Sequence, residues 1–168
     1  MKNQYTKQIH NLEPVFDAFS KILILGSFPS ILSRDSKFFY GHPQNRFWKV
    51  IATLFHEEVP KNIDEKKALL LKHHIAIWDV VKCCEIIGSA DNSIRNVEPN
   101  DLNRILRKTS IQNIYVNGKE AFKLYNQYIL PIIQKEAILL PSTSPANAKY
   151  SLTDLCQAWQ KIITIDKE

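Results

Sequence analysis

The residues best suited to chemistry lie in one stretch, GSFPSILSRDSKFFYGHPQNRFW, at positions 26–48. About 18 residues separate an apolar run from the next helical pattern, where two to six are usual. Basic groups alternate there with aromatic rings, which suits a site that holds a nucleobase and its phosphate backbone. A loop whose aromatic side chains simply cover the core would have the same composition. The groups are hydroxyls at Ser27, Ser30 and Ser33, cations at Arg34, Lys37 and Arg46, and rings at Phe38, Phe39 and Tyr40.

A second stretch, LPSTSPANAKYS at positions 140–151, also contains groups that bind anions. Three small hydroxyl residues and two prolines precede Asn147 and Lys149. Serine hydroxyls and backbone N–H groups at the approach to a helix are good phosphate ligands. Taken alone, the stretch is more typical of a proline-braced turn before a helix.

Asp79 follows an apolar run and Trp78. Its carboxylate could accept a hydrogen bond from a ring N–H of a base, or act in acid–base chemistry. It could equally cap the next segment, which is the commoner role of an Asp after a strand. Cys83 has no paired histidine and fits packing better than nucleophilic catalysis. The histidines lack ligand spacing, and the nucleotide-binding and serine-hydrolase motifs are absent, so we expect no metal and no cofactor.

Apolar runs and turn residues predict the elements that position these groups. Strands are expected at 21–27, 74–79, 112–117 and 136–140, helices at 45–55, 64–72, 99–108, 119–128 and 151–165, and irregular structure at 83–99. Ser151 is the expected N-cap of the last helix. Strands that alternate with helices predict an α/β fold with a mostly parallel sheet covered on both faces. Ligands in such folds bind beyond the carboxyl ends of the strands. The segments at these four ends are GSFPS, WDVVKC, NGK and LPSTSPANA.

Length and composition limit the class of protein. The 168 residues suit one domain, 1–168, and 45% hydrophobic with 23% charged residues excludes disordered and fibrous chains. No apolar run approaches the ~20 residues of a membrane span, and the first ten residues lack a signal peptide's apolar core. A net charge of +5 weakly favours an anionic partner such as nucleic acid. Three cysteines, two of them adjacent, fit neither a disulfide framework nor a zinc site, so we expect a reduced, cytoplasmic protein.

Together these stretches resemble the uracil-DNA glycosylase superfamily. GSFPS and GHPQNRFWKVI are similar to the first motif region of the mismatch-specific (G:T/U) glycosylases, and WDVVKC to the second-strand motif. STSPAN takes the place of the last motif, and the combination is similar to the hypoxanthine-DNA (deoxyinosine) glycosylase branch. The resemblance spans roughly residues 20–165 and implies a three-layer sandwich with a central parallel four-stranded sheet flanked by helices. One branch carries an iron–sulfur cluster, but three cysteines cannot supply four ligands.

The resemblance implies a monofunctional enzyme that flips a deaminated base out of DNA and hydrolyses its N-glycosidic bond in base excision repair. Asn45 is the implied catalytic residue that positions water, since Phe28 occupies the place of the usual asparagine. Ser144 replaces the residue that stabilises the leaving base. Tyr40 takes the position of the ring that stacks on the flipped base. Asp79 takes the position of the residue that recognises its Watson–Crick edge, and could accept from hypoxanthine or from uracil.

The remaining expectations concern contacts with the substrate. Ser27, Phe28 and Asn147 are expected to contact the base or nucleotide, and Ser33, Arg34 and Lys149 the DNA backbone. Hypoxanthine is the first expected base, in single- or double-stranded DNA, and the enzyme is expected to be a monomer. The replacements at Phe28 and Ser144 leave open a protein that binds DNA lesions without cutting them. The strand pattern alone would also allow an unrelated hydrolase of free nucleosides.

Overall fold

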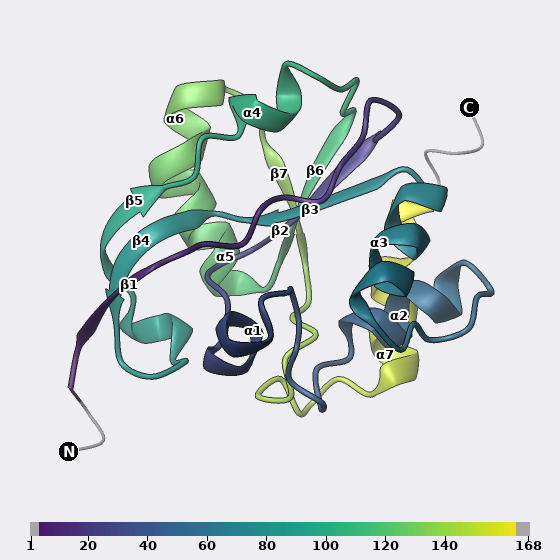
Figure 1. The fold of residues 1–168 in the computed structure, drawn as a ribbon, viewed down its shortest axis with the longest axis horizontal. Coiled ribbons are helices and arrows are strands. Elements are labelled where there is room, and N and C mark those ends of the chain that lie inside the picture. Colours follow the sequence, from purple (N-terminus) through teal and green to yellow (C-terminus); the bar gives the residue numbers. More distant parts are fainter. Residues whose placement is uncertain (1–3, 164–168) are drawn as a thin grey trace.

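The computed structural model describes residues 4–163, and a parallel four-stranded sheet forms its centre (Figure 1). Its order is β3 (Ile75–Asp79), β2 (Ile22–Gly26), β6 (Asn113–Asn117) and β7 (Ala137–Leu140), with every pair parallel. All residues of β2 and β3 are buried. Nearly continuous apolar runs are typical of strands that are covered on both faces. The four strands predicted from the sequence therefore form one sheet.

Helices cover both faces of this sheet. Figure 1 shows α2 (Phe47–Leu54), α3 (Ile63–Lys72) and α7 (Leu152–Trp159) together on one side. On the other side lie α5 (Lys119–Leu124) and α6 (Leu130–Ile133), joined by a π-helical turn at Tyr125–Ile129. The three-layer α/β sandwich implied by the resemblance is thus confirmed.

Three of the predicted helices differ in extent. The predicted helix at 99–108 is mostly wrong, since only α4 (Asn103–Leu106) is helical. The predicted helix at 119–128 continues through the π turn into α6. The last helix begins after the predicted N-cap Ser151, which forms a capping box with Asp154, and a 3-10 turn at Gln160–Ile162 follows it. Residues 164 and 165 of that prediction lie outside the described residues.

The segment 83–99, predicted to be irregular, is mostly strand. β4 (Val81–Ile86) and β5 (Arg95–Pro99) pair antiparallel, and β1 (Thr6–Ile9) joins β4 to give a sheet ordered β1-β4-β5. The prediction failed because β5 is largely exposed and β4 is buried only in part, so neither carries an apolar run. A short 3-10 turn, Asp91–Ser93, lies between these strands in the sequence.

The long loop after β2 contains a short helix that the sequence did not predict, α1 (Ile31–Ser36), with Ser30 as its N-cap. Phe38 and Phe39 in this loop are buried in the core, whereas Tyr40 is half-buried. Phe38 and Phe39 thus cover the core, while Phe39 and Tyr40 also border the cavity described below.

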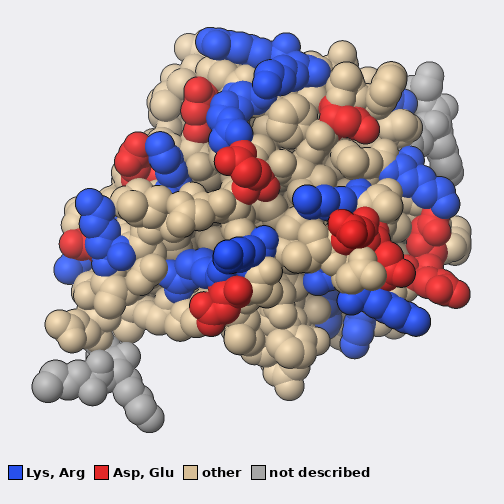
Figure 2. Space-filling model, in the orientation of Figure 1, with Lys and Arg blue, Asp and Glu red and all other residues tan. Residues whose placement is uncertain are grey.

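Charged side chains are dispersed over the visible face. Figure 2 shows Lys and Arg interspersed with Asp and Glu on it, while its lower edge, where the loop after β7 lies in Figure 1, is largely uncharged. The net charge of +5 is therefore not gathered into one basic patch on this face. Among residues 4–163, no helix is long and apolar enough to cross a membrane.

Candidate active site

A cavity of about 550 Å³ lies beyond the carboxyl ends of the parallel strands. Each strand contributes to its wall: Gly26 ends β2, Asp79 ends β3, Asn117 ends β6, and Ser142 and Thr143 follow β7. The chain proceeds from β2 to β3 on one side and later to β6 on the other, so the strand order reverses beside β2. A reversal of this kind leaves a crevice at the strand ends where ligands bind. The loops selected from the sequence do converge.

Asp79 is the most constrained group in this cavity. Its side chain is only 5% exposed, and its Oδ2 lies 2.7 Å from Nε2 of His10. The amide of Asn100 donates to its backbone carbonyl at 2.8 Å. A Cβ atom at Gly26 would lie 2.4 Å from Oδ1 of Asp79, so only glycine leaves room for this oxygen. The sequence predicted Asp79 at the site but gave no signal for His10.

A second carboxylate, Asp91, was missed because it lies in the segment predicted to be irregular. Its Oδ2 accepts a hydrogen bond of 2.6 Å from the hydroxyl of the buried Ser27, and both residues line the cavity. The residue as a whole is exposed, while its carboxylate turns inward to Ser27. Burial of that group raises the pKa of Asp91 to about 6; the Ser27 hydrogen bond opposes this shift, and the charges of Asp79 and Glu120 add to it. A carboxylate with a pKa near neutrality suits proton transfer.

Aromatic rings form another part of the wall. Tyr40 stacks on Phe47 with ring centroids 4.0 Å apart and planes inclined by 17°, and Phe28 and Phe39 also line the cavity. The Tyr40 backbone has a φ of 53°, a conformation that is uncommon outside glycine. Its hydroxyl is buried and has no hydrogen-bond partner of good geometry among the described residues. Burial, and then the charge of Asp79, raise the pKa of Tyr40, so the phenol stays protonated.

Asn45 belongs to a chain of hydrogen bonds opposite the carboxylates. Its Oδ1 accepts from the backbone N–H of Phe47 and from the hydroxyl of Thr143, both at 2.9 Å. The Thr143 hydroxyl in turn accepts from the Asn117 amide at 3.0 Å, and the Thr143 N–H donates to Asn117 Oδ1. The Phe47 N–H fixes which way the Asn45 amide faces. With Oδ1 occupied twice, the group that Asn45 offers to a ligand is its NH₂.

The loop after β7 is held by Arg46. Its guanidinium donates to the carbonyls of Ser144, Asn147 and Tyr150, so it braces the loop and is not a free cation. Ser144 lines the cavity, and its hydroxyl accepts from the N–H of Ala146.

Other predicted residues lie around the cavity or beyond it. Asn147 and Lys149 line an adjoining cavity of about 730 Å³ instead, which shares Asp91, Asn117 and Ser144 with the first. The Ser33 hydroxyl is buried and accepts from the Gly41 N–H at 2.9 Å.

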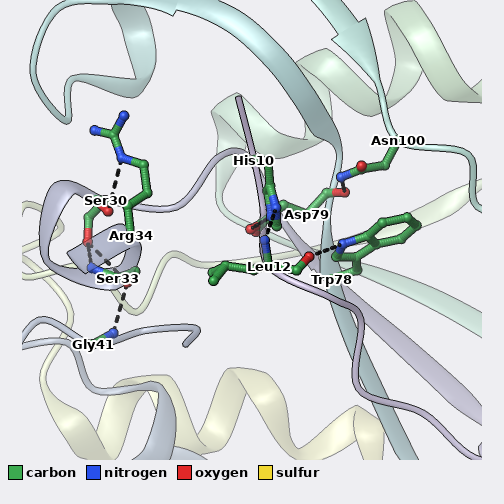
Figure 3. Close-up of polar contacts among 9 residues, drawn as sticks. All are labelled: His10, Leu12, Ser30, Ser33, Arg34, Gly41, Trp78, Asp79 and Asn100. Atoms are coloured by element: carbon green, nitrogen blue, oxygen red, sulfur yellow. Dashed lines mark hydrogen bonds and ion pairs between the residues drawn. The ribbon is translucent and has the colours of Figure 1, made fainter. Parts of the chain in front are cut away.

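Arg34 bonds the carbonyls of Ser30 and Gly88 and lies over the Phe28 ring at 5.4 Å. The structure thus uses Ser33 and Arg34 to brace the loop around α1 (Figure 3). Their contact with DNA stays a prediction. In the part of the chain from 4 to 163, no group of three or more His, Cys, Asp or Glu residues is arranged to hold a metal ion.

Several side chains that line or support the cavity were not predicted from the sequence, for different reasons. Asn117 ends a predicted strand and is the first residue of the NGK segment, so its position was a usable signal. Thr143 lies inside a stretch that was noted only for its phosphate-binding groups. Asp91 and His10 depend on the antiparallel sheet, which the apolar pattern did not show.

Comparisons with known proteins show the family and agree with the fold. The family model of the uracil DNA glycosylase superfamily matches residues 13–163. A hypoxanthine DNA glycosylase of Methanosarcina acetivorans is 35% identical over 82% of this chain and 87% of its own. One of Methanosarcina barkeri is 32% identical over 87% of this chain and 92% of its own. A solution NMR structure of a candidate uracil DNA glycosylase from M. acetivorans has a TM-score of 0.78 and 29% identity, and the match covers 97% of this chain and 100% of that one.

The fold and the cavity at the strand ends define a DNA glycosylase, an enzyme whose substrate is DNA. The chain belongs to the uracil DNA glycosylase superfamily.

Proposed function

We propose that this enzyme is a monofunctional glycosylase that removes hypoxanthine from DNA as the first step of base excision repair. The observation that carries the proposal is the buried Asp79 carboxylate, whose Oδ2 is bound to His10 while Oδ1 remains for a ligand. An ionised carboxylate only accepts hydrogen bonds. Hypoxanthine has an N–H at N1, where adenine has a lone pair, so this acceptor favours the deaminated purine. The relatives named hypoxanthine DNA glycosylases support the choice of base.

The flipped base would lie against the aromatic part of the wall. Because Tyr40 already stacks on Phe47, a base that packs on the free surface of Tyr40 extends an existing stack. Stacking of a base on an aromatic ring is worth about 1–3 kcal/mol. The fixed oxygen of Asp79 then faces the polar edge of the base. Stacking provides affinity for any base, and Asp79 provides the selection.

The bond from C1′ to the base breaks with its electron pair leaving on the base, and a water oxygen then bonds to C1′. Asn45 contributes through its NH₂, which donates to the water or to the departing base, because its Oδ1 is already used twice. Asp91 takes the proton of that water, since no described residue hydrogen-bonds its Oδ1 and its pKa is about 6. Ser144, at the same cavity, supplies a weaker donor to the leaving base.

DNA on either side of the flipped nucleotide would follow the adjoining cavity. Asn147 and Lys149 line it, and Lys149 is exposed, as a contact to phosphate requires. Arg46 fixes this loop through three carbonyls, so the loop meets DNA already ordered. Flipping costs a few kcal/mol and least for a mispaired base, so selection begins before the base enters the cavity.

The test is cleavage of end-labelled duplexes that contain one hypoxanthine or one uracil, followed by alkali, under single-turnover conditions. We expect a cut at hypoxanthine in excess of any cut at uracil. A cut at uracil alone would keep the glycosylase and contradict the substrate. A duplex that is bound and left uncut would favour the lesion-binding alternative that Phe28 and Ser144 raised.

A further inference from the structure

We propose that His10 is a positioning residue that sets base selectivity, because it fixes which hydrogen-bonding character Asp79 presents to the flipped base. This inference rests on the proposed recognition of the base by Asp79 and assigns its control to a residue outside the parallel sheet. Figure 3 shows the arrangement, in which His10 lies between the Leu12 backbone and the Asp79 side chain.

The backbone determines which nitrogen of His10 carries the proton. The N–H of Leu12 donates to Nδ1 of His10 at 3.0 Å, so Nδ1 must be the unprotonated acceptor. The ring proton therefore lies on Nε2, which faces Oδ2 of Asp79 at 2.7 Å. Any atom of residue 79 that faces His10 must accept this hydrogen bond. Oδ2 is thus committed, and Oδ1 is the oxygen left for the ligand.

The position of His10 is itself fixed by the antiparallel sheet. β1 pairs with β4, and the His10 N–H continues that pairing by donating to the Lys82 carbonyl. Two residues later the Leu12 carbonyl accepts from the indole N–H of Trp78 at 3.0 Å. The imidazole is fully buried, with its ring centroid 5.9 Å from that of Phe28 and 6.0 Å from that of Phe39. A hydrogen bond between buried polar groups in apolar surroundings is strong and costly to break.

The asymmetry of this contact gives a sharp prediction for Asp79→Asn. The His10 N–H still requires an acceptor, so the amide oxygen turns toward His10 and the NH₂ occupies the ligand side. The cavity then donates where it formerly accepted, which suits adenine N1 and rejects hypoxanthine N1–H. In Asp79→Asn combined with His10→Leu, the amide is free to rotate, and the selection is lost.

The test measures equilibrium binding of duplexes whose lesion nucleoside carries a 2′-fluorine, which resists cleavage. Hypoxanthine and adenine are compared opposite the same abasic analogue, so that pairing energy does not enter. We expect the wild type to prefer hypoxanthine, Asp79→Asn to shift the ratio of affinities toward adenine by roughly 10- to 100-fold, and the double variant to bring it near one. His10→Gln, which keeps a donor toward Asp79, should retain more of the wild-type ratio than His10→Leu.

The outcomes separate two failures. If the wild type binds both 2′-fluoro duplexes equally and leaves an unmodified hypoxanthine duplex uncut, the proposed function is wrong and this inference falls with it. If the wild type prefers hypoxanthine but Asp79→Asn gives the same ratio with and without His10→Leu, the role of His10 alone is refuted. Thermal unfolding of each variant checks its fold, and His10→Gln provides the comparison should His10→Leu not fold.

Discussion

The cavity has two walls of different chemistry. The carboxylate wall consists of Asp79, Asp91 and their partners Ser27 and His10, and it is completed by the antiparallel sheet. The amide wall consists of Asn45, Asn117 and Thr143, linked in one chain of neutral hydrogen bonds. The first wall can accept hydrogen bonds, and the second leaves the Asn45 NH₂ as a donor. We infer that the carboxylate wall selects the base and takes the proton of water, whereas the amide wall stabilises the negative charge on the departing base.

The largest effect should come from Asn45→Asp. The new carboxylate still accepts from the Phe47 N–H and the Thr143 hydroxyl, but the donor is gone. Removal of one preorganised donor to a developing charge costs about 10²–10³ in rate. This loss of rate is measured by single-turnover cleavage of a hypoxanthine duplex. Asn126→Asp, which adds the same charge at an exposed helical position away from the cavity, is the control. Equal losses in the two variants would refute the role of the Asn45 NH₂.

Asp91→Asn should remove the pH dependence of cleavage. Because the pKa of Asp91 is raised to about 6, its ionised and active form accumulates between about pH 5 and 7, and the wild-type rate should rise over that window. The variant should be at least about tenfold slower at pH 7 and flat over the same range. Asp64→Asn, in the exposed first turn of α3, should keep the wild-type profile.

The same shift affects stability in the opposite sense. When folding raises the pKa of a carboxyl, the free energy of unfolding of the protein falls as the pH increases from the unfolded-state pKa to the folded-state pKa. The free energy of unfolding should therefore fall between about pH 4 and 6 in the wild type and fall less in Asp91→Asn, as urea denaturation would show. An Asp91→Asn protein with an unchanged pH profile in both activity and stability would contradict the assignment.

Thr143→Val tests the amide wall through its middle member. The isosteric change leaves the Asn45 oxygen and the Asn117 amide without the hydroxyl, and Thr143 is fully buried. We expect a loss of about 1–3 kcal/mol in the free energy of unfolding and roughly tenfold in rate. Thr143→Ser should restore both, since it keeps the hydroxyl. A variant that lost stability while keeping full rate would separate the network from catalysis.

The smallest effect is expected for Lys149→Ala. This side chain is exposed on the adjoining cavity, so its removal should weaken binding a few-fold for damaged and undamaged duplexes alike. The slope of log affinity against log salt should fall by about one. Lys108→Ala, just after α4, should leave the slope unchanged. A change in preference between bases would show that Lys149 acts in selection.

The parallel sheet was predictable because its strands appear as apolar runs, and β2 and β3 are buried throughout. The rule that ligands bind at strand ends then selected the loops that contain Ser27, Asp79 and Ser144. The antiparallel sheet was not predictable in this way, since the exposed β5 carries no apolar signal. His10 and Asp91 were therefore not predicted, because the antiparallel sheet and its connections position both residues. Arg34 and Arg46 both donate to backbone carbonyls, a role that composition cannot distinguish from phosphate binding.

The division between the two walls is tested most directly by measuring affinity and single-turnover rate on the same hypoxanthine duplex in Asp79→Asn and Asn45→Asp. We predict that Asp79→Asn lowers the affinity for the hypoxanthine duplex relative to the undamaged one. Asn45→Asp should bind it nearly as well as the wild type does and cleave it at least about 100-fold more slowly. If both variants lost affinity alone, or both lost rate alone, the two walls would share one role and the account would be wrong.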